Sequence, residues 1–358
     1  MSETQQLKTG QLSDAALLEF HFFMRLSREW ELRFEKLFRT GAVAKWYSAV
    51  GNEAITVPAA TCIEAGDALF TLHRDSGAIL RYYLDVEELL PGRVPVSQPR
   101  RKPGVASGEL FYRLACQVLG AAAGFSEGYE RSYHYNVIDA DAELIHVGMI
   151  SHLGAMIPVA AGAAFALKRR GSDRVALNFI GDGGTSTGDF HEGLNMAAVL
   201  RAPLILVIEN NQYALSTPVR QQYAAESLAA RAAGYGIPGA RVDGHDAEAV
   251  WAEVGRAVDR ARNGEGPTVI EAVVQRLRGH SEGDDSHLLF SEEDRKAALE
   301  LDCLRTFEGK LVERDLVSRD YLDDIRETCA RLVLEVADRA LASRESEPEA
   351  GERPIYAD

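Results

Sequence analysis

The sequence has few cysteines, no excess of positive charge and no long apolar run. Its basic side chains number 39 against 54 acidic ones, and the net charge of −15 argues against binding to nucleic acid or to an anionic membrane. The longest apolar run, residues 153–167, is too short to span a bilayer even when its glycines and proline are counted. The four cysteines are far apart and form no CxxC pair: Cys62, Cys116, Cys303 and Cys329. A disulfide framework or a cysteine zinc site is therefore not expected, and buried, reduced thiols are.

The chain is long enough for a deep core and reads as an ordinary globular protein. With 358 residues, 46% apolar and 26% charged, it has room for one large or two moderate domains. The first twenty residues hold one lysine, no arginine and no apolar segment, so neither a secretory nor a mitochondrial presequence is expected. We therefore predict a cytoplasmic protein without a membrane anchor.

The middle of the chain alternates between strand-like and helix-like segments. Short β-rich runs end in turn residues at three places: 175–180, 203–208 and 268–274. A helical pattern of apolar residues lies between the first two runs. Such alternation predicts parallel βαβ units and a doubly wound, mostly parallel sheet, which is an α/β fold.

Three regions of the chain differ in composition and in the secondary structure that we expect. We expect an N-terminal helical extension (1–45) with one or two amphipathic helices over 12–40, an α/β domain (46–290), and a charged helical region with a polar tail (291–358) in which Ser291 and Asp294 form a capping box. Inside the α/β domain, the basic, proline-containing segment 91–108 has no periodicity and predicts a surface loop, mobile or ordered by a partner.

Two polar motifs follow neighbouring predicted strands. Gly181-Asp182-Gly183-Gly184 directly follows the first strand, and Asn210-Asn211 ends the next one, so that Asp182 and Asn211 are 29 residues apart (211 − 182). In a parallel sheet, ligands bind beyond the carboxyl ends of strands, where glycines let backbone amides approach phosphate oxygens. A carboxylate there would repel a diphosphate unless a cation lies between them, and oxygen ligands suit Mg²⁺. A GDG turn alone is weak evidence for such a site, because glycine-rich turns are common in α/β proteins. With the second motif at this spacing, coincidence becomes a minor alternative.

The GDG motif, an intervening helix and strand, and the NN pair closely resemble the thiamine-diphosphate motif. The surrounding residues 181–217 look like the α subunit of the first component of 2-oxo acid dehydrogenases, the family of pyruvate and branched-chain enzymes. The resemblance covers about residues 12–340 and is densest over 146–286. It implies the side chains of Asp182 and Asn211 and the backbone carbonyl of Tyr213 as Mg²⁺ ligands, with Gly181, Gly183 and Gly184 against the cofactor.

The resemblance assigns further residues to the same site. His73 and Arg74 occupy the place of a Tyr-Arg pair that grips the diphosphate, although an isolated arginine is more often in a surface ion pair. Arg276 would contact phosphate, and His280 would orient the diphosphate and assist acyl transfer.

Ser151 and Leu153 would line the aminopyrimidine pocket. His134 aligns with a family histidine and is either catalytic or a core residue. The helix after Leu153 is equally compatible with subunit packing and with a simple core role. Ser281 matches a serine that is phosphorylated in relatives, but a loop hydrogen bond is the simpler role.

The resemblance also implies partners. We find no glutamate for the cofactor pyrimidine and no second α/β domain, so a β subunit is expected to supply both in an α₂β₂ heterotetramer. The implied reaction is decarboxylation of a 2-oxo acid with reductive acyl transfer to a lipoyl-bearing acyltransferase core. Residues 284–286 and the pair Ser151 and Leu153 favour a branched-chain substrate slightly over pyruvate. An acetoin dehydrogenase, a split transketolase-like transferase and a non-catalytic binding subunit stay open as alternatives.

Overall fold

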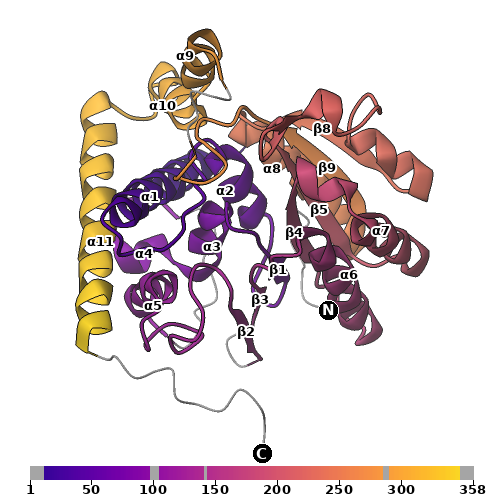
Figure 1. The fold of residues 1–358 in the computed structure, drawn as a ribbon, viewed down its shortest axis with the longest axis horizontal. Coiled ribbons are helices and arrows are strands. Elements are labelled where there is room, and N and C mark those ends of the chain that lie inside the picture. The colour runs from indigo at the N-terminus through magenta and orange to yellow at the C-terminus, as the bar shows by residue number, and fades with distance from the viewer. Residues whose placement is uncertain (1–11, 97–104, 141–142, 285–289, 347–358) are drawn as a thin grey trace, which may run out of the picture.

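The structure, a computed structural model, describes residues 12–96, 105–140, 143–284 and 290–346. Seven of its strands form one sheet in the order β2-β3-β1-β4-β5-β9-β8 (Figure 1). Neighbouring strands are parallel except for β2, which runs antiparallel to β3 at one edge. The strands are β1 (Ala68–Phe70), β2 (Asn136–Asp139), β3 (Leu144–Val147), β4 (Ala176–Gly181), β5 (Leu204–Asn210), β8 (Gly239–Asp243), β9 (Thr268–Val273) and, in a separate hairpin, β6 (Tyr213–Ala214) and β7 (Thr217–Pro218). The predicted α/β fold is confirmed, and so are its three strands.

Helices cover both faces of this sheet. They are α1 (Asp14–Arg39), α2 (Glu53–Thr61), α3 (Ser76–Tyr83), α4 (Val86–Leu89), α5 (Ser107–Leu119), α6 (Met156–Arg169), α7 (Gly188–Leu200), α8 (Ala247–Arg262), α9 (Glu292–Glu300), α10 (Cys303–Glu313) and α11 (Arg319–Ser346). The part of the chain that the structure describes also has four short 3₁₀ segments at turns: η1 (Leu153–Ala155), η2 (Asp182–Ser186), η3 (Val219–Gln221) and η4 (Ala229–Tyr235).

The central strands are buried on both faces because a layer of helices packs on each. Leu177 and Phe179 of β4 point into the cluster that contains α2, α3 and α8, whereas Ile180 points to the side of α6 and α7. Figure 1 shows the sheet between these two layers. Strand β5 is buried at every position, which explains why its first five residues, 204–208, form a continuous apolar run rather than an alternating one.

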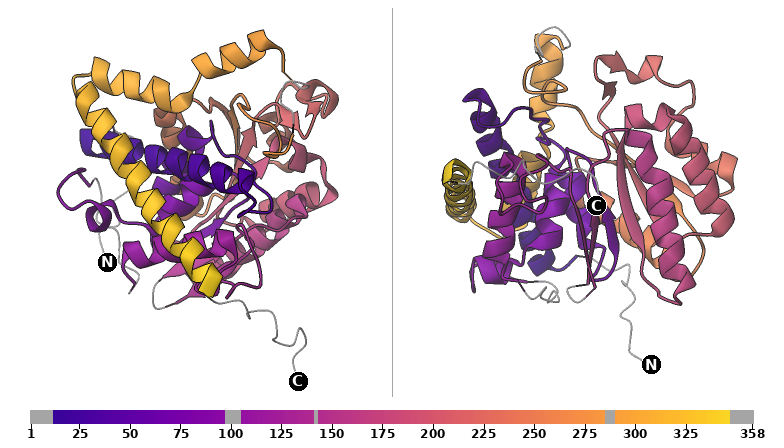
Figure 2. Two further views of the ribbon diagram at one scale, coloured as in Figure 1. Left: turned by 60° about the vertical axis from the view of Figure 1, so that its left-hand side comes forward. Right: turned by 60° about the horizontal axis from the view of Figure 1, so that its bottom comes forward.

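The N- and C-terminal helices pack on each other outside the layer of α2 and α3. The amphipathic pattern over 12–40 forms one long helix, α1, whose N-cap Ser13 accepts a hydrogen bond from the Ala16 amide at 3.2 Å. Helix α11 crosses α1 on the outer side of the molecule (Figure 2). The region after Ser291 is helical as predicted, and both terminal regions share the main apolar core with the α/β domain.

The predicted loop 91–108 is shorter than expected at its end. Ser107 and Gly108 are the first residues of α5, because the Ser107 amide is held by the Glu88 carboxylate at 2.8 Å and its hydroxyl accepts from the Asp85 amide. Val94 is buried in the main core, and residues 97–104 lie outside the described residues. All four cysteines are buried and free, as predicted. Among the described helices, none is both long and apolar enough to cross a membrane.

Candidate active site at the carboxyl edge of the sheet

The two polar motifs lie at the ends of adjacent parallel strands. Gly181, the last residue of β4, pairs with Glu209 of β5, so Asp182 and Asn211 both follow directly beyond this edge. Asp182 begins the 3₁₀ turn η2, in which the Thr185 hydroxyl donates to the Asp182 carbonyl at 2.7 Å. Both side chains are nearly buried, at 2% and 7% exposed. The register of the sheet thus brings the two predicted ligands to one place.

Asp182 has a partner that the sequence did not reveal. Gln222 donates from Nε2 to Asp182 Oδ2 at 2.7 Å and to the Thr217 carbonyl at 2.9 Å, and its Oε1 is buried without a partner. Burial raises the pKa of Asp182, and the hydrogen bond from Gln222 opposes that shift. A buried carboxylate in this state gains from a nearby cation.

Gly183 allows the hairpin β6–β7 to lie close to the turn. A Cβ at Gly183 would lie 2.5 Å from Cβ of Ala214, and a Cβ at Gly184 would lie 2.7 Å from Cγ1 of Ile180. Only glycine fits at these two positions without moving a neighbour. The close approach keeps Tyr213, the residue before Ala214, beside the ends of β4 and β5.

Arg276 joins the same edge from the end of β9. Its Nη1 donates to the Tyr213 carbonyl at 3.3 Å, and its guanidinium lies over the Tyr213 and Phe290 rings at 5.4 and 5.6 Å. Burial and the charge of Arg74 lower the pKa of Arg276 to about 10, so the group is still charged at neutral pH. Its Nη2 is buried and has no hydrogen-bond partner. A buried cationic donor without a partner, beside a buried carboxylate, fits a bound metal–diphosphate.

His73, Arg74 and His280 are brought together by a loop that the sequence did not single out, residues 46–52 (the 46–52 loop). Arg74 donates to the carbonyls of Ser48 and, at 2.6 Å, of His280. The Tyr47 ring lies 4.2 Å from the His73 ring and 5.2 Å from the His280 ring. In the structure, the two Nη atoms of Arg74 thus contact backbone carbonyls and not a surface carboxylate, and its role toward phosphate stays a prediction.

Both histidines of this cluster are neutral at neutral pH. Burial, followed by the charges of Arg74 and Arg276, lowers the pKa of His280 to about 4. Burial and the Arg74 charge likewise lower the pKa of His73 well below its ordinary value. An anion bound between the arginines would offset part of this repulsion.

The residues predicted to line the pyrimidine pocket, Ser151 and Leu153, follow Met149, which lies beside His73. His134 Nδ1 donates to the Arg131 carbonyl at 3.2 Å, which leaves Nε2 to accept from the Ser151 hydroxyl at 2.9 Å. His134 is only half-buried, so it is not a core histidine. Met149 Sδ lies 3.1 Å from His73 Nδ1, and Leu153 packs against the cluster that contains Ile180.

The first asparagine of the NN pair and the glutamate before it form buried hydrogen bonds at the end of β5. Asn210 donates to Glu271 Oε1 at 2.7 Å and accepts from Gln212, so it fixes the end of β5. Glu209 accepts from Asn52 Nδ2 at 2.9 Å, and burial with the adjacent Asp75 carboxyl raises its pKa well above the ordinary value. A glutamate inside an apolar strand was a visible signal of such a buried contact. By contrast, no local pattern distinguishes Gln222 or the 46–52 loop.

Comparison with known proteins finds one matching family model and several similar α subunits. The model of the family described as dehydrogenase E1 component matches residues 101–349. The 3-methyl-2-oxobutanoate dehydrogenase α subunit of Mycobacterium tuberculosis is 35% identical over 308 residues, 86% of this chain and 74% of that protein. The acetoin:2,6-dichlorophenolindophenol oxidoreductase α subunit of Cupriavidus necator is 33% identical over 94% of this chain and 93% of its own length. A pyruvate dehydrogenase E1 α subunit of Staphylococcus aureus is 46% identical over 176 residues, 49% of this chain and 48% of its own.

Proposed function

Since this chain belongs to the dehydrogenase E1 component family, as the α subunit of a 2-oxo acid dehydrogenase, we propose that it binds thiamine diphosphate with Mg²⁺ beyond β4 and β5. The proposed activity is oxidative decarboxylation of a 2-oxo acid with reductive acyl transfer to a lipoyl domain. The observation that carries the proposal is the pairing of Gly181 with Glu209, which puts Asp182 and Asn211 directly beyond one edge of the sheet. At this edge Arg276 donates to the Tyr213 carbonyl and has a buried Nη2 without a hydrogen-bond partner.

In this proposal the chain holds the metal and the diphosphate. The side chains of Asp182 and Asn211 and the carbonyl of Tyr213 would ligate Mg²⁺, and Arg276 would donate to a phosphate oxygen. Gly183 lets the backbone come near, since it carries no Cβ. Arg74 donates a hydrogen bond to the carbonyl of His280, and its positive charge would favour the bound diphosphate.

The bound cofactor would supply a nucleophilic carbon and an electron sink for decarboxylation. The chain's own side chains would orient the cofactor and exchange protons with the reacting groups. His280 is neutral at neutral pH, and a bound diphosphate beside Arg74 and Arg276 would raise its lowered pKa and so favour uptake of a proton during acyl transfer. His134 accepts at Nε2 from Ser151, which fixes that hydroxyl at the edge of the pyrimidine pocket.

We propose a β subunit as the partner, in an α₂β₂ heterotetramer that serves a lipoyl-bearing acyltransferase. The described residues build one mostly parallel seven-stranded sheet and a two-stranded hairpin, and the described residues after β9 form only helices. This supports a second chain as the source of the other half of a two-domain cofactor site. The buried free thiols and the negative net charge support a cytoplasmic location without nucleic-acid partners.

For the substrate we favour a branched-chain 2-oxo acid over pyruvate. The features that favour it are residues 284–286 and the pair Ser151 and Leu153, which resemble those of branched-chain enzymes. The Mycobacterium tuberculosis relative carries a branched-chain name, but the relatives also include pyruvate and acetoin enzymes. Acetoin is therefore the second candidate.

The test is an assay of this chain co-expressed with its β subunit. Dye reduction is followed on 2-oxoisovalerate, pyruvate and acetoin, with and without thiamine diphosphate and Mg²⁺. We expect cofactor-dependent turnover that is fastest on 2-oxoisovalerate. Ketol transfer between sugar phosphates would identify a transketolase-like enzyme instead, and cofactor binding without any turnover would identify a non-catalytic subunit.

A further inference from the structure

The 46–52 loop is buried, although it has no regular secondary structure. Two of its amides donate to side-chain carboxyl groups from outside the loop: Ala49 donates to Glu31 Oε2 at 3.0 Å, and Gly51 donates to Glu53 Oε2 at 2.8 Å. A buried loop needs such acceptors, because its backbone cannot reach water. The position of the loop therefore depends on where these two carboxylates are held.

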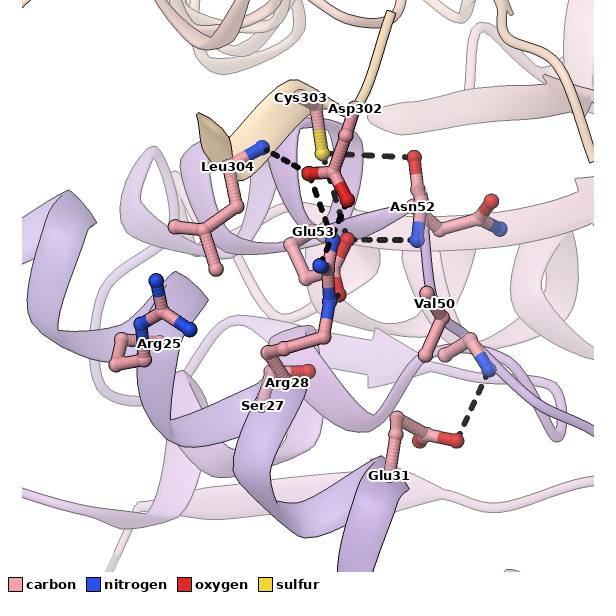
Figure 3. A network of polar contacts seen from close by, with 12 residues as sticks. Arg25, Ser27, Arg28, Glu31, Val50, Asn52, Glu53, Asp302, Cys303 and Leu304 are labelled. Atoms are coloured by element: carbon pink, nitrogen blue, oxygen red, sulfur yellow. Dashed lines mark hydrogen bonds and ion pairs between the residues drawn. The ribbon is translucent and has the colours of Figure 1, made fainter. Parts of the chain in front are cut away.

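Glu53 is held by an ion pair with Arg28 of α1, and Arg28 in turn pairs with Asp302 at the start of α10 (Figure 3). Arg28 of α1 donates from Nε to Glu53 Oε1 at 2.5 Å and forms a two-pronged contact with Asp302, at 2.8 and 3.1 Å. Asp302 is also the N-cap of α10, accepting from the amides of Leu304 and Arg305. The side chains of Arg28, Glu53 and Asp302 are 11%, 0% and 14% exposed.

Cys303 adds a direct contact from α10 to the loop. Its thiol donates to the Gly51 carbonyl at 3.6 Å and lies 3.4 Å from Glu53 Oε2. Asp302 and Cys303 thus join the start of α10 to the point where the loop enters α2. The loop in turn carries Tyr47 against the two histidines, the Ser48 carbonyl against Arg74 and the Asn52 amide against Glu209.

We propose that Arg28, Glu53 and Asp302 are positioning residues that set cofactor affinity by fixing the 46–52 loop. The proposal rests on the proposed function and extends it to residues that do not touch the site. The two-pronged contact with Asp302 orients the Arg28 guanidinium, and the guanidinium orients Glu53. When that orientation is lost, the loop no longer presents the Ser48 carbonyl and Tyr47 in one fixed place.

The same two helices offer a matched control. One turn earlier on α1, Arg25 donates to Glu308 of α10 at 2.5 Å, with side chains 13% and 19% exposed. No hydrogen bond in the described residues joins Arg25 or Glu308 to the 46–52 loop. Asp302→Asn and Glu308→Gln therefore each remove one charge from an α1–α10 contact, but only the first acts on the loop. Asparagine also keeps the N-cap of α10.

The experiment uses the full chain co-expressed with its β subunit. Hydrogen exchange of the peptide spanning the loop is measured without cofactor, and thiamine diphosphate affinity is measured by calorimetry with Mg²⁺. We expect both variants to lower Tm to a similar extent, whereas Asp302→Asn alone speeds exchange in the loop and raises the cofactor Kd about tenfold, as for one lost charge-assisted hydrogen bond. Cys303→Ala, a small change that leaves the ion pairs in place, should raise loop exchange to a lesser degree.

Each outcome decides one of the two proposals. If Asp302→Asn and Cys303→Ala leave loop exchange and Kd at the wild-type values while Tm falls, the network is structural only and the inference is wrong. If the wild-type complex binds no thiamine diphosphate, the proposed function fails. The exchange measurement still shows in that case whether these residues fix the loop.

Discussion

The candidate site is built from two regions that reach it by different routes. The strand-end region, Asp182 and Asn211 with their turns, lies within one βαβ unit and is positioned by the register of β4 and β5. The 46–52 loop has no strand pairing to fix it and depends on Glu31, on Glu53 and, through Arg28, on Asp302, which is 274 positions from Arg28. The predicted metal ligands therefore come from one βαβ unit, whereas the loop beside them is held by side chains of helices far away in the sequence. The two regions should respond differently to mutation.

The largest effect is expected in the strand-end region. Asp182→Ala removes the single carboxylate of the predicted metal set, so Mg²⁺-dependent binding of thiamine diphosphate should fall below detection by calorimetry. Asp243→Ala is the control, since Asp243 ends β8 at the same edge of the sheet but is exposed. Unchanged affinity in Asp182→Ala would refute the metal assignment.

A smaller loss is expected where the two regions meet. Arg74 links the Ser48 carbonyl of the loop with the His280 carbonyl, and lysine cannot reach both as the planar guanidinium does. Arg74→Lys should weaken cofactor binding about 10- to 100-fold, the loss of one or two hydrogen bonds to a charged group. Arg81→Lys tests whether any buried arginine gives this result, because Arg81 is paired with Glu19 within the helical layer. Equal effects on cofactor Kd in the two variants would remove Arg74 from the site.

A further step down is expected for Gln222, which contacts Asp182, the predicted metal ligand. Gln222→Ala removes the hydrogen bond to Asp182 Oδ2, and we expect about tenfold weaker Mg²⁺ affinity, typical of a residue that orients a ligand. Gln221→Ala is the matched control, since its side chain is the exposed neighbour in η3. Mg²⁺ titration of the cofactor-loaded complex measures both. If the two variants behave alike, Gln222 only stabilises the hairpin.

The same contrast explains what the sequence predicted. The parallel sheet, the long N-terminal helix and the C-terminal helices follow from apolar periodicity. The placement of Asp182 and Asn211 at one edge follows from strand ends that share this edge. Gln222 and the 46–52 loop were missed because their contacts depend on tertiary packing. Tyr47 and Ser48 have no distinctive sequence pattern. The acceptors that hold their loop, Glu31 and Glu53, are recognised only from the tertiary structure. The early start of α5 was missed because its first turn is stabilised by Asp85 and Glu88.

The smallest effect is expected from protonation of His280, whose ring contacts Tyr47 of the loop. Its pKa is about 4 in the folded chain against an ordinary 6.5, owing to burial and to the charges of Arg74, Arg276 and Lys45, which Asp284 opposes in part. The unfolded chain therefore binds more protons between these values, and the free energy of unfolding falls as pH drops from about 6.5 to about 4. His280→Gln removes this contribution, so its Tm should fall less than that of wild type between pH 7 and pH 5. Because the ring is only half-buried, the difference is expected to be modest. Parallel curves of Tm against pH for the two proteins would mean that His280 titrates as in water, and that the loop does not enclose it.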